Sequence, residues 1–163
     1  MTGDAPRPGE VALPFDPAAR ADASLVFIGR VASPWSRGDC PKNLREARAR
    51  GGDFALLVDA DFRAGLAGLR PGAEVIVLYW TGQARRDLIV QSPAHRPGPT
   101  GVFALRSPAR PNPVAVAVTR ITTLDAATGR IGIEAIDAFD GTPLLDLKPW
   151  LPGVDIPPQT QGP

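Results

Sequence analysis

Cysteine is almost absent from this 163-residue chain, which contains only Cys40. A single cysteine excludes an internal disulfide and a cysteine-based zinc site, and it suits a reducing cytoplasm. The one histidine, His95, has no serine or cysteine motif beside it on which a catalytic triad could be built. No apolar run approaches the roughly 20 residues of a membrane helix. The N-terminus carries Asp4 and Glu10 and lacks the apolar core of an export signal, so we expect a cytoplasmic protein with no membrane contact.

Proline and glycine, by contrast, are abundant, with 19 and 17 residues. That composition favours many short strands and turns over long helices. A hydrophobic content of 44% and a charged content of 21% are ordinary for one soluble domain with a real core. We therefore expect a single domain at residues 24–155, with a disordered tail at 1–23 and a C-terminal tail at 156–163.

The order of the segments predicts a mainly β fold. Short apolar or alternating runs indicate about eight strands, at 25–31, 54–59, 74–80, 86–91, 101–105, 114–122, 130–136 and 144–147. Only two short helices are indicated, one after Asn43 and one from Asp61 to Leu69. Helices are missing between most strands, which excludes a parallel α/β fold, and no strand–GxGxxG–helix unit indicates a Rossmann site. We predict a mostly antiparallel, open β-barrel.

The charge is unevenly distributed along the chain. The formal net charge is only +1, but the span from Arg30 to Arg120 holds 14 basic and 7 acidic residues. A basic middle favours a polyanionic partner, because arginine and lysine neutralise phosphates. Arginine-rich surfaces are also common in proteins of this composition, so this observation supports a nucleic-acid partner only weakly.

The segment 101–113 reads GVFALRSPARPNP and organises the chain. We expect it to open as a strand and to continue as a rigid cationic loop, since three prolines in six residues restrict the backbone. Arg106 and Arg110 are placed there for planar, bidentate binding of a carboxylate, a phosphate or a base edge. The alternative is a proline-rich turn whose arginines point into water. A second polar segment, DAFDGTPLLDLKP at 137–149, favours the first interpretation.

Together these two segments resemble the paired signatures of the TsaA/TrmO family, and FIGRV followed by SPW at 27–35 is similar to that family's opening. Two long motifs in the right order are specific, and the resemblance covers roughly residues 25 to 155. It implies a β-barrel that binds S-adenosylmethionine and, in the family's characterised tRNA members, methylates N6 of threonylcarbamoyladenosine beside the anticodon. It also implies a homodimer with the site near the subunit interface. The expected partner is tRNA, with no DNA and no metal.

The resemblance also implies which residues bind the cofactor. The acidic side chains could take the ribose hydroxyls or the ammonium group, Arg106 the carboxylate, and the backbone near Val116 and 144–147 the adenine or methionine. The full set is Pro41, Lys42, Asn43, Gln83, Arg106, Ser107, Val116, Asp137, Asp140, Leu144, Leu145, Asp146 and Leu147. Structural alternatives exist: Asn43 as a helix cap, Asp140 as the cap of its own turn, and Asp146 with Lys148 as a surface pair.

The expected substrate-binding residues are Arg110, Asn112 and Lys148, because a rigid Arg–Asn loop suits phosphate or base-edge recognition. The methylated nitrogen must lose a proton, and an aspartate of raised pKa could accept it, so Asp146 is the candidate catalytic base. No feature of the sequence fixes this base.

The chain departs from the family pattern at two places. Gly72-Ala73-Glu74 stands where many relatives have Phe-Ser-His, and Gly82-Gln83 stands where many have a His-Gln pair. These departures, with no further domain expected after Asp155, keep two other functions open. One is a methyltransferase with a small-molecule acceptor, and the other is a non-catalytic module that binds RNA or an anionic metabolite.

Overall fold

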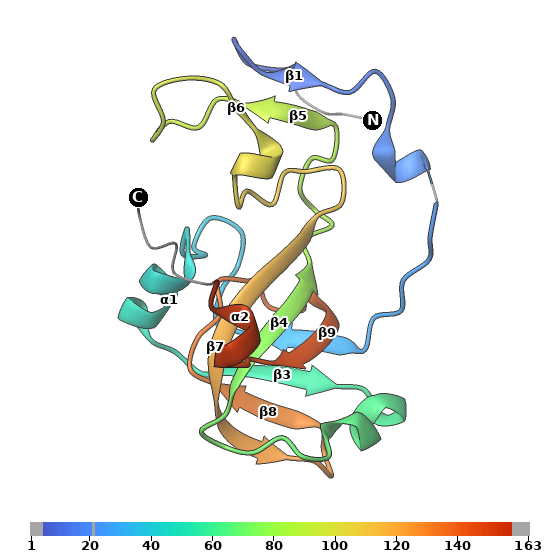
Figure 1. The fold of residues 1–163 in the computed structure, drawn as a ribbon, viewed down its shortest axis with the longest axis vertical. Coiled ribbons are helices and arrows are strands. Elements are labelled where there is room, and N and C mark those ends of the chain that lie inside the picture. The colour runs from blue at the N-terminus through green and yellow to red at the C-terminus, as the bar shows by residue number, and fades with distance from the viewer. Residues whose placement is uncertain (1–4, 21, 158–163) are drawn as a thin grey trace. The chain divides into compact units, whose positions relative to one another are not determined.

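The computed structural model describes residues 5–20 and 22–157. Its elements are, in chain order, β1 (Val11–Ala12), η1 (Pro17–Ala19), β2 (Gly29–Ala32), α1 (Leu44–Arg50), β3 (Phe54–Val58), η2 (Ala60–Leu66), β4 (Glu74–Trp80), β5 (Leu88–Gln91), β6 (Thr100–Gly101), η3 (Val102–Ala104), β7 (Val114–Asp125), β8 (Arg130–Ile133), β9 (Pro143–Pro149) and α2 (Pro152–Asp155). The elements η1, η2 and η3 are short 3₁₀ helices. Figure 1 shows all of these elements, which confirm a mainly β chain with short helices.

The chain divides into two compact units. We call Phe27–Leu78 with Val116–Pro163 the barrel unit, and Met1–Val26 with Tyr79–Ala115 the loop unit. Strands β4 and β7 run from one unit into the other.

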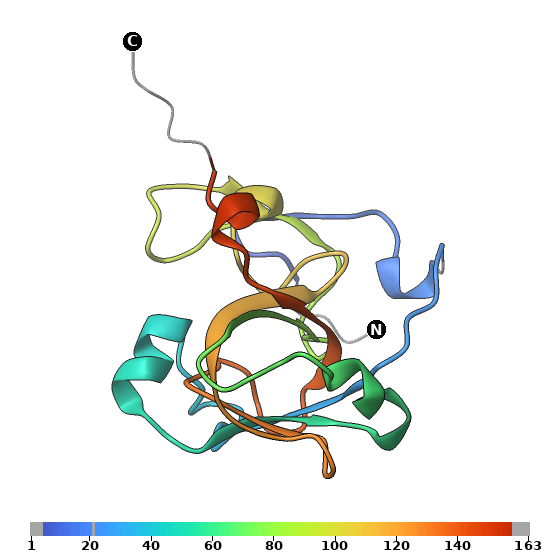
Figure 2. The same ribbon diagram turned by 60° about the horizontal axis from the view of Figure 1, so that its bottom comes forward.

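Six strands form a closed barrel in the order β2-β3-β8-β7-β4-β9. Figure 2 shows these strands curving around a common centre. The antiparallel barrel and the absence of a Rossmann unit are as predicted, but the barrel is closed where we expected it to be open. Closure comes from β9, which pairs with β2 through Leu144 opposite Gly29 and is also the neighbour of β4.

Alternation along the strands builds the barrel core. In β4, every second residue, Val75, Val77 and Tyr79, is buried. Side chains from the facing strands are fully buried as well: Val31, Leu56, Ile121, Ile131 and Leu144. Burial of such apolar side chains contributes about 1.5–3 kcal/mol each.

Glycine is required where β2 meets β3. Gly29 has a φ of 155°, and a Cβ at this position would collide with the carbonyl oxygen of Leu57. The close approach of the two backbones therefore depends on the missing side chain.

The loop unit contains a small sheet of order β1-β5-β6. β1 pairs antiparallel with β5, and the Leu13 amide donates to the Asp87 carbonyl at 2.7 Å. Residues 5–20 thus contain β1 and η1, where we expected a disordered tail. The other parts of that tail, residues 1–4 and 21, lie outside the described residues, as do 158–163 of the expected C-terminal tail.

The apolar run that we expected as a strand at 101–105 is mostly a turn. β6 ends at Gly101, and Val102–Ala104 form η3, closed by the Leu105 amide donating to the Val102 carbonyl at 3.1 Å. Among the described residues, no helix is both long and apolar enough to cross a membrane.

Candidate functional site

In the barrel unit, two segments more than 100 residues apart are joined by hydrogen bonds. The Ser33 hydroxyl donates to the Ala138 carbonyl at 2.7 Å, and the Ser33 amide donates to the Asp140 carboxylate at 3.2 Å. The buried Trp35 indole donates to the Ile136 carbonyl at 2.8 Å. These bonds hold the Ser-Pro-Trp loop against the second signature segment.

Asp140 begins a tight turn whose backbone is also tied to β2. The Gly141 amide donates to the Val31 carbonyl at 2.9 Å, and Gly141 takes a φ of 74°. The Thr142 hydroxyl donates to the Phe139 carbonyl at 2.7 Å. One Asp140 oxygen accepts the Ser33 amide, and the other has no hydrogen-bond partner among the described residues. Asp140 therefore presents a held carboxylate oxygen with its acceptor capacity unused.

The Arg50 side chain lies over the indole ring of Trp35. The Arg50 guanidinium carbon is 4.4 Å from the ring centroid, and Arg50 also pairs with Asp39 at 2.7 Å. Burial, and then the negative charge of Asp137, raise the pKa of the neighbouring Cys40 thiol to about 11. A thiol of that pKa is protonated at neutral pH, so Cys40 is not a nucleophile.

The segment Pro41-Lys42-Asn43 forms the start of α1. The Asn43 side chain accepts the Glu46 amide at 2.9 Å, and the Glu46 carboxylate accepts the Lys42 amide at 3.0 Å. This is the helix-cap alternative. Pro41 is buried, whereas the side chains of Lys42 and Asn43 are exposed.

Strand β9 carries the candidate base. The Asp146 carboxylate accepts the Leu147 amide at 2.9 Å and pairs with Lys148 at 2.8 Å. The side chains of Asp146 and Lys148 are 46% and 59% exposed. An exposed carboxylate–ammonium pair of this kind is typical of a protein surface. The geometry therefore supports the surface-pair alternative for these two residues.

In the loop unit, side chains hold the signature loop by its backbone. Three carbonyl groups at alternate positions each accept a side-chain hydrogen bond, and the pairs are Gln91 with Ala109, Arg86 with Pro111, and Thr81 with Pro113. Arg86 also lies over the Trp80 ring at 5.5 Å and reaches the Pro17 carbonyl at 3.4 Å. Prolines cannot donate to a strand ladder, so these side chains supply the order that a neighbouring strand would give.

The two arginines of the signature loop differ. Arg110 donates to the carbonyls of Val102 and Leu105, both at 3.3 Å, so its guanidinium is used inside the loop. Arg106 and Asn112 are exposed, and the Ser107 hydroxyl accepts the Ala109 amide at 3.3 Å. Arg110 therefore has a structural role in the loop, and its contact with substrate stays a prediction.

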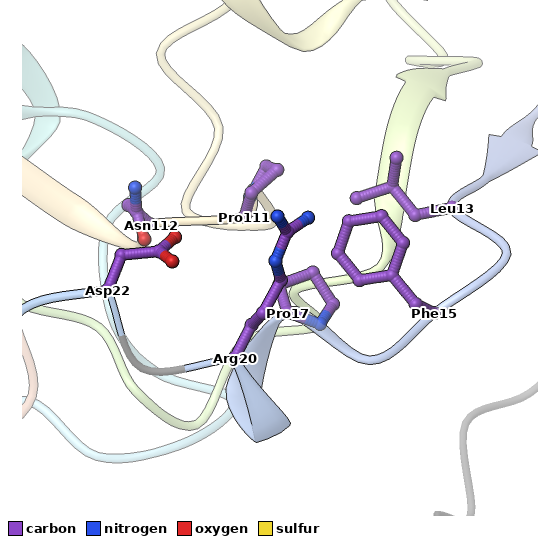
Figure 3. Close-up of a pocket in the computed structure, with 7 residues that line it drawn as sticks. All are labelled: Leu13, Phe15, Pro17, Arg20, Asp22, Pro111 and Asn112. Carbon is purple, nitrogen blue, oxygen red and sulfur yellow. The ribbon is translucent and has the colours of Figure 1, made fainter.

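A hollow of about 170 Å³ lies beside Asn112. Its lining consists of Leu13, Phe15, Pro17, Arg20, Asp22, Pro111 and Asn112. Figure 3 shows the Arg20 guanidinium, the Asp22 carboxylate and the Asn112 amide around one opening. The N-terminal segment thus forms a wall of a hollow that the signature loop also lines.

The expected site residues fall into two groups. The barrel unit holds Pro41, Lys42, Asn43, Val116, Asp137, Asp140, Leu144, Leu145, Asp146, Leu147 and Lys148, and the loop unit holds Gln83, Arg106, Ser107, Arg110 and Asn112. Sequence reasoning missed Arg86 and Gln91, which lie in no motif. Ser33 and Trp35 were noted only as part of the opening segment that resembles the family. The occurrence of that opening together with the second signature segment was the feature of the sequence that could have indicated their contact.

A family model described as the tRNA-methyltransferase O N-terminal domain matches residues 30–156. The chain belongs to this family. The matched range nearly coincides with the domain expected at 24–155, and it leaves β1 and η1 outside the family domain.

Relatives and solved structures agree with this assignment. The chain is 35% identical over 140 residues to VirR of Rhizobium radiobacter, covering 85% of this chain and 75% of that protein. It is 33% identical over 139 residues to a protein of Archaeoglobus fulgidus, covering 85% and 96%. The first is named as a probable S-adenosyl-L-methionine-binding protein, and the second as an S-adenosyl-L-methionine-binding protein.

The crystal structure of TrmO from Pseudomonas aeruginosa superposes with a TM-score of 0.65 at 28% identity. The match covers 85% of this chain and 60% of that one, so this chain spans less than two thirds of the solved protein.

Proposed function

We propose that this protein is an S-adenosylmethionine-dependent methyltransferase that methylates N6 of threonylcarbamoyladenosine in the anticodon loop of tRNA. The observation that carries the proposal is the family match over residues 30–156, which includes both signature segments. The names of the relatives support the cofactor, and the description of the family supports the tRNA substrate.

The chemistry of the residues fits this cofactor. Its ribose hydroxyls and ammonium group need acceptors, and Asp140 offers an unused carboxylate oxygen while Asp137 is half-buried. Its carboxylate needs a cation, for which Arg106 is the candidate. The backbone of Leu144–Leu147 would contact the adenine or methionine. When bound, the cofactor supplies an activated methyl group for direct displacement.

The protein's own contribution to methyl transfer is positioning and electrostatics. A displacement of this kind is fast when the nucleophile is held in line with the methyl carbon. The Arg86, Gln91 and Thr81 hydrogen bonds preorganise the loop that carries Arg106 and Asn112. Asn112 is the substrate contact that the geometry favours, because its amide is exposed beside the hollow.

We also propose a homodimer in the cytoplasm. The family resemblance suggests that the site lies near a subunit interface, and the single cysteine suits a reducing compartment. Light scattering of the purified protein should give twice the chain mass of 17.2 kDa.

Methyl transfer from radiolabelled S-adenosylmethionine tests the proposal. We expect label to enter tRNA that carries threonylcarbamoyladenosine and not tRNA that lacks this modification. Asp140→Asn keeps an oxygen for the Ser33 amide but removes the charge, and it should lower the rate about tenfold or more. Asp53→Asn, which removes an exposed carboxylate 89% open to solvent, is the matched control. Cofactor binding without transfer to any tRNA would favour a small-molecule acceptor.

A further inference from the structure

Phe103, in the middle of the first signature segment, is the most exposed large hydrophobic side chain that the structure describes, at 82%. Its neighbour Val102 is only 1% exposed. A phenylalanine left in water next to a buried anchor forgoes the stabilisation that burial of its ring would bring. An exposed aromatic ring on an ordered turn offers a flat face on which a nucleic-acid base can stack.

The turn that carries Phe103 is held on both sides. The Leu105 amide closes it on the Val102 carbonyl, and the Arg110 guanidinium donates to the carbonyls of Val102 and Leu105. On the N-terminal side, β6 pairs with β5 through Gly101 opposite Val90. The backbone of Phe103 is therefore fixed before any partner arrives, so binding costs little ordering entropy.

Along the chain, the charges on both sides of this turn have one sign. No aspartate or glutamate occurs between Asp87 and Asp125, a stretch that includes the whole β5–β6 hairpin and the signature loop. The hairpin loop at 92–99 carries Arg96, which is exposed, and Arg106 is exposed after η3. An exposed aromatic ring on a segment that carries cations and no acidic residue is complementary to a polyanion that has flat apolar groups.

We propose that Phe103 is a stacking platform for an unpaired base of the RNA substrate, and that Arg96 contacts the adjacent phosphate. This proposal rests on the proposed function and extends it to Phe103 and Arg96, neither of which is among the expected cofactor or substrate ligands. A second copy of the chain is the competing occupant of this surface, and the oligomeric state measured below distinguishes the two.

Fluorescence anisotropy with a labelled anticodon stem-loop RNA tests the platform. Phe103→Ala should weaken binding about tenfold to a hundredfold, because stacking on an aromatic ring contributes that much per base. Phe103→Trp should restore binding to within a few-fold of wild type, since tryptophan also offers a π-face. Phe62→Ala, at a partly exposed phenylalanine of η2 in the barrel unit, is the matched control and should bind like wild type.

Two further readouts separate the parts of the proposal. A fully paired RNA duplex should be insensitive to Phe103→Ala, because its bases are already stacked. Arg96→Ala should weaken the binding of both the stem-loop and the duplex. It should also reduce the slope of log K against log salt concentration by about one.

The proposal is overturned if Phe103→Ala binds the stem-loop like wild type. It is also overturned if the variant binds RNA more weakly and light scattering shows that its dimer has dissociated, because the loss then follows from the broken dimer. Titration with S-adenosylmethionine is run in parallel. If the cofactor fails to bind wild type, the proposed function fails whatever Phe103 does. If it binds wild type and the variant equally, the RNA data bear on the platform alone.

Discussion

At the scale of single residues, Arg86 does the most to set the shape of the signature loop. Its guanidinium donates to the Pro111 carbonyl at 2.7 Å, reaches the Pro17 carbonyl at 3.4 Å and lies over the Trp80 ring. A planar group with several N–H donors can do all three at once, and an ammonium group cannot.

Arg86→Lys should therefore keep the charge and lose the geometry. We expect a loss of about 1.5–3 kcal/mol in the free energy of unfolding, since hydrogen bonds to charged groups contribute that amount. Chemical denaturation measures this loss. Arg45→Lys, at an exposed arginine of α1, is the control, and the Arg86 assignment is wrong if both variants unfold alike.

Cys40 gives a second prediction at this scale. Burial and the charge of Asp137 raise its pKa to about 11, so the thiolate appears only as the pH approaches that value. Iodoacetamide should modify native protein slowly at pH 7 and several-fold faster at pH 10, with urea-unfolded protein reacting faster at both. Rapid labelling of the native thiol at pH 7 would contradict the burial that the structure describes.

At the scale of elements, β1 is held by polar contacts as much as by its short ladder. The Glu10 side chain is 2% exposed and accepts hydrogen bonds from the Arg7 guanidinium at 2.7 Å and from the Arg7 amide at 3.0 Å. These hydrogen bonds lower the pKa of Glu10 to about 2.

A carboxylate whose pKa is lowered by folding stabilises the folded state at any pH above its unfolded pKa, which is near 4.5 for Glu10. This stabilisation is lost as the pH falls toward the folded pKa of about 2. We expect the β1 amide signals of Val11 and Ala12 in NMR spectra to keep their native positions at pH 5 and to collapse toward unfolded positions below about pH 3. In Glu10→Gln the same collapse should already be present at pH 5. Unchanged signals in this variant would show that the ladder alone holds β1.

The sequence predicts these elements unevenly, for physical reasons. Strands whose apolar residues alternate, such as β4 and β7, were predicted because burial of one face imposes that period. β1 was missed because its contacts reach partners about 80 residues away and leave no period in a proline-rich segment. η3 was mistaken for strand because a turn with one buried and one exposed apolar residue looks like a strand when only hydropathy is considered.

At the scale of the whole molecule, the chain has a closed six-stranded barrel and a second unit built from the signature loop, the β5–β6 hairpin and β1. The two signature segments were recognisable in the sequence because both are long. The hydrogen bonds within these segments were not recognisable, since Arg110 and Asn112 are both polar residues of one motif and the sequence does not distinguish their roles. Only the structure shows one guanidinium donating to the carbonyls of its own loop and one amide exposed beside a hollow.

Calorimetric titration with S-adenosylmethionine tests the central claim most directly. Wild type should bind with micromolar affinity, Arg106→Ala should lose this binding, and Arg45→Ala, at an exposed arginine of α1, should keep it. A folded wild-type protein that gives no heat of binding would contradict the methyltransferase account and leave a module for RNA or another anion as the better explanation.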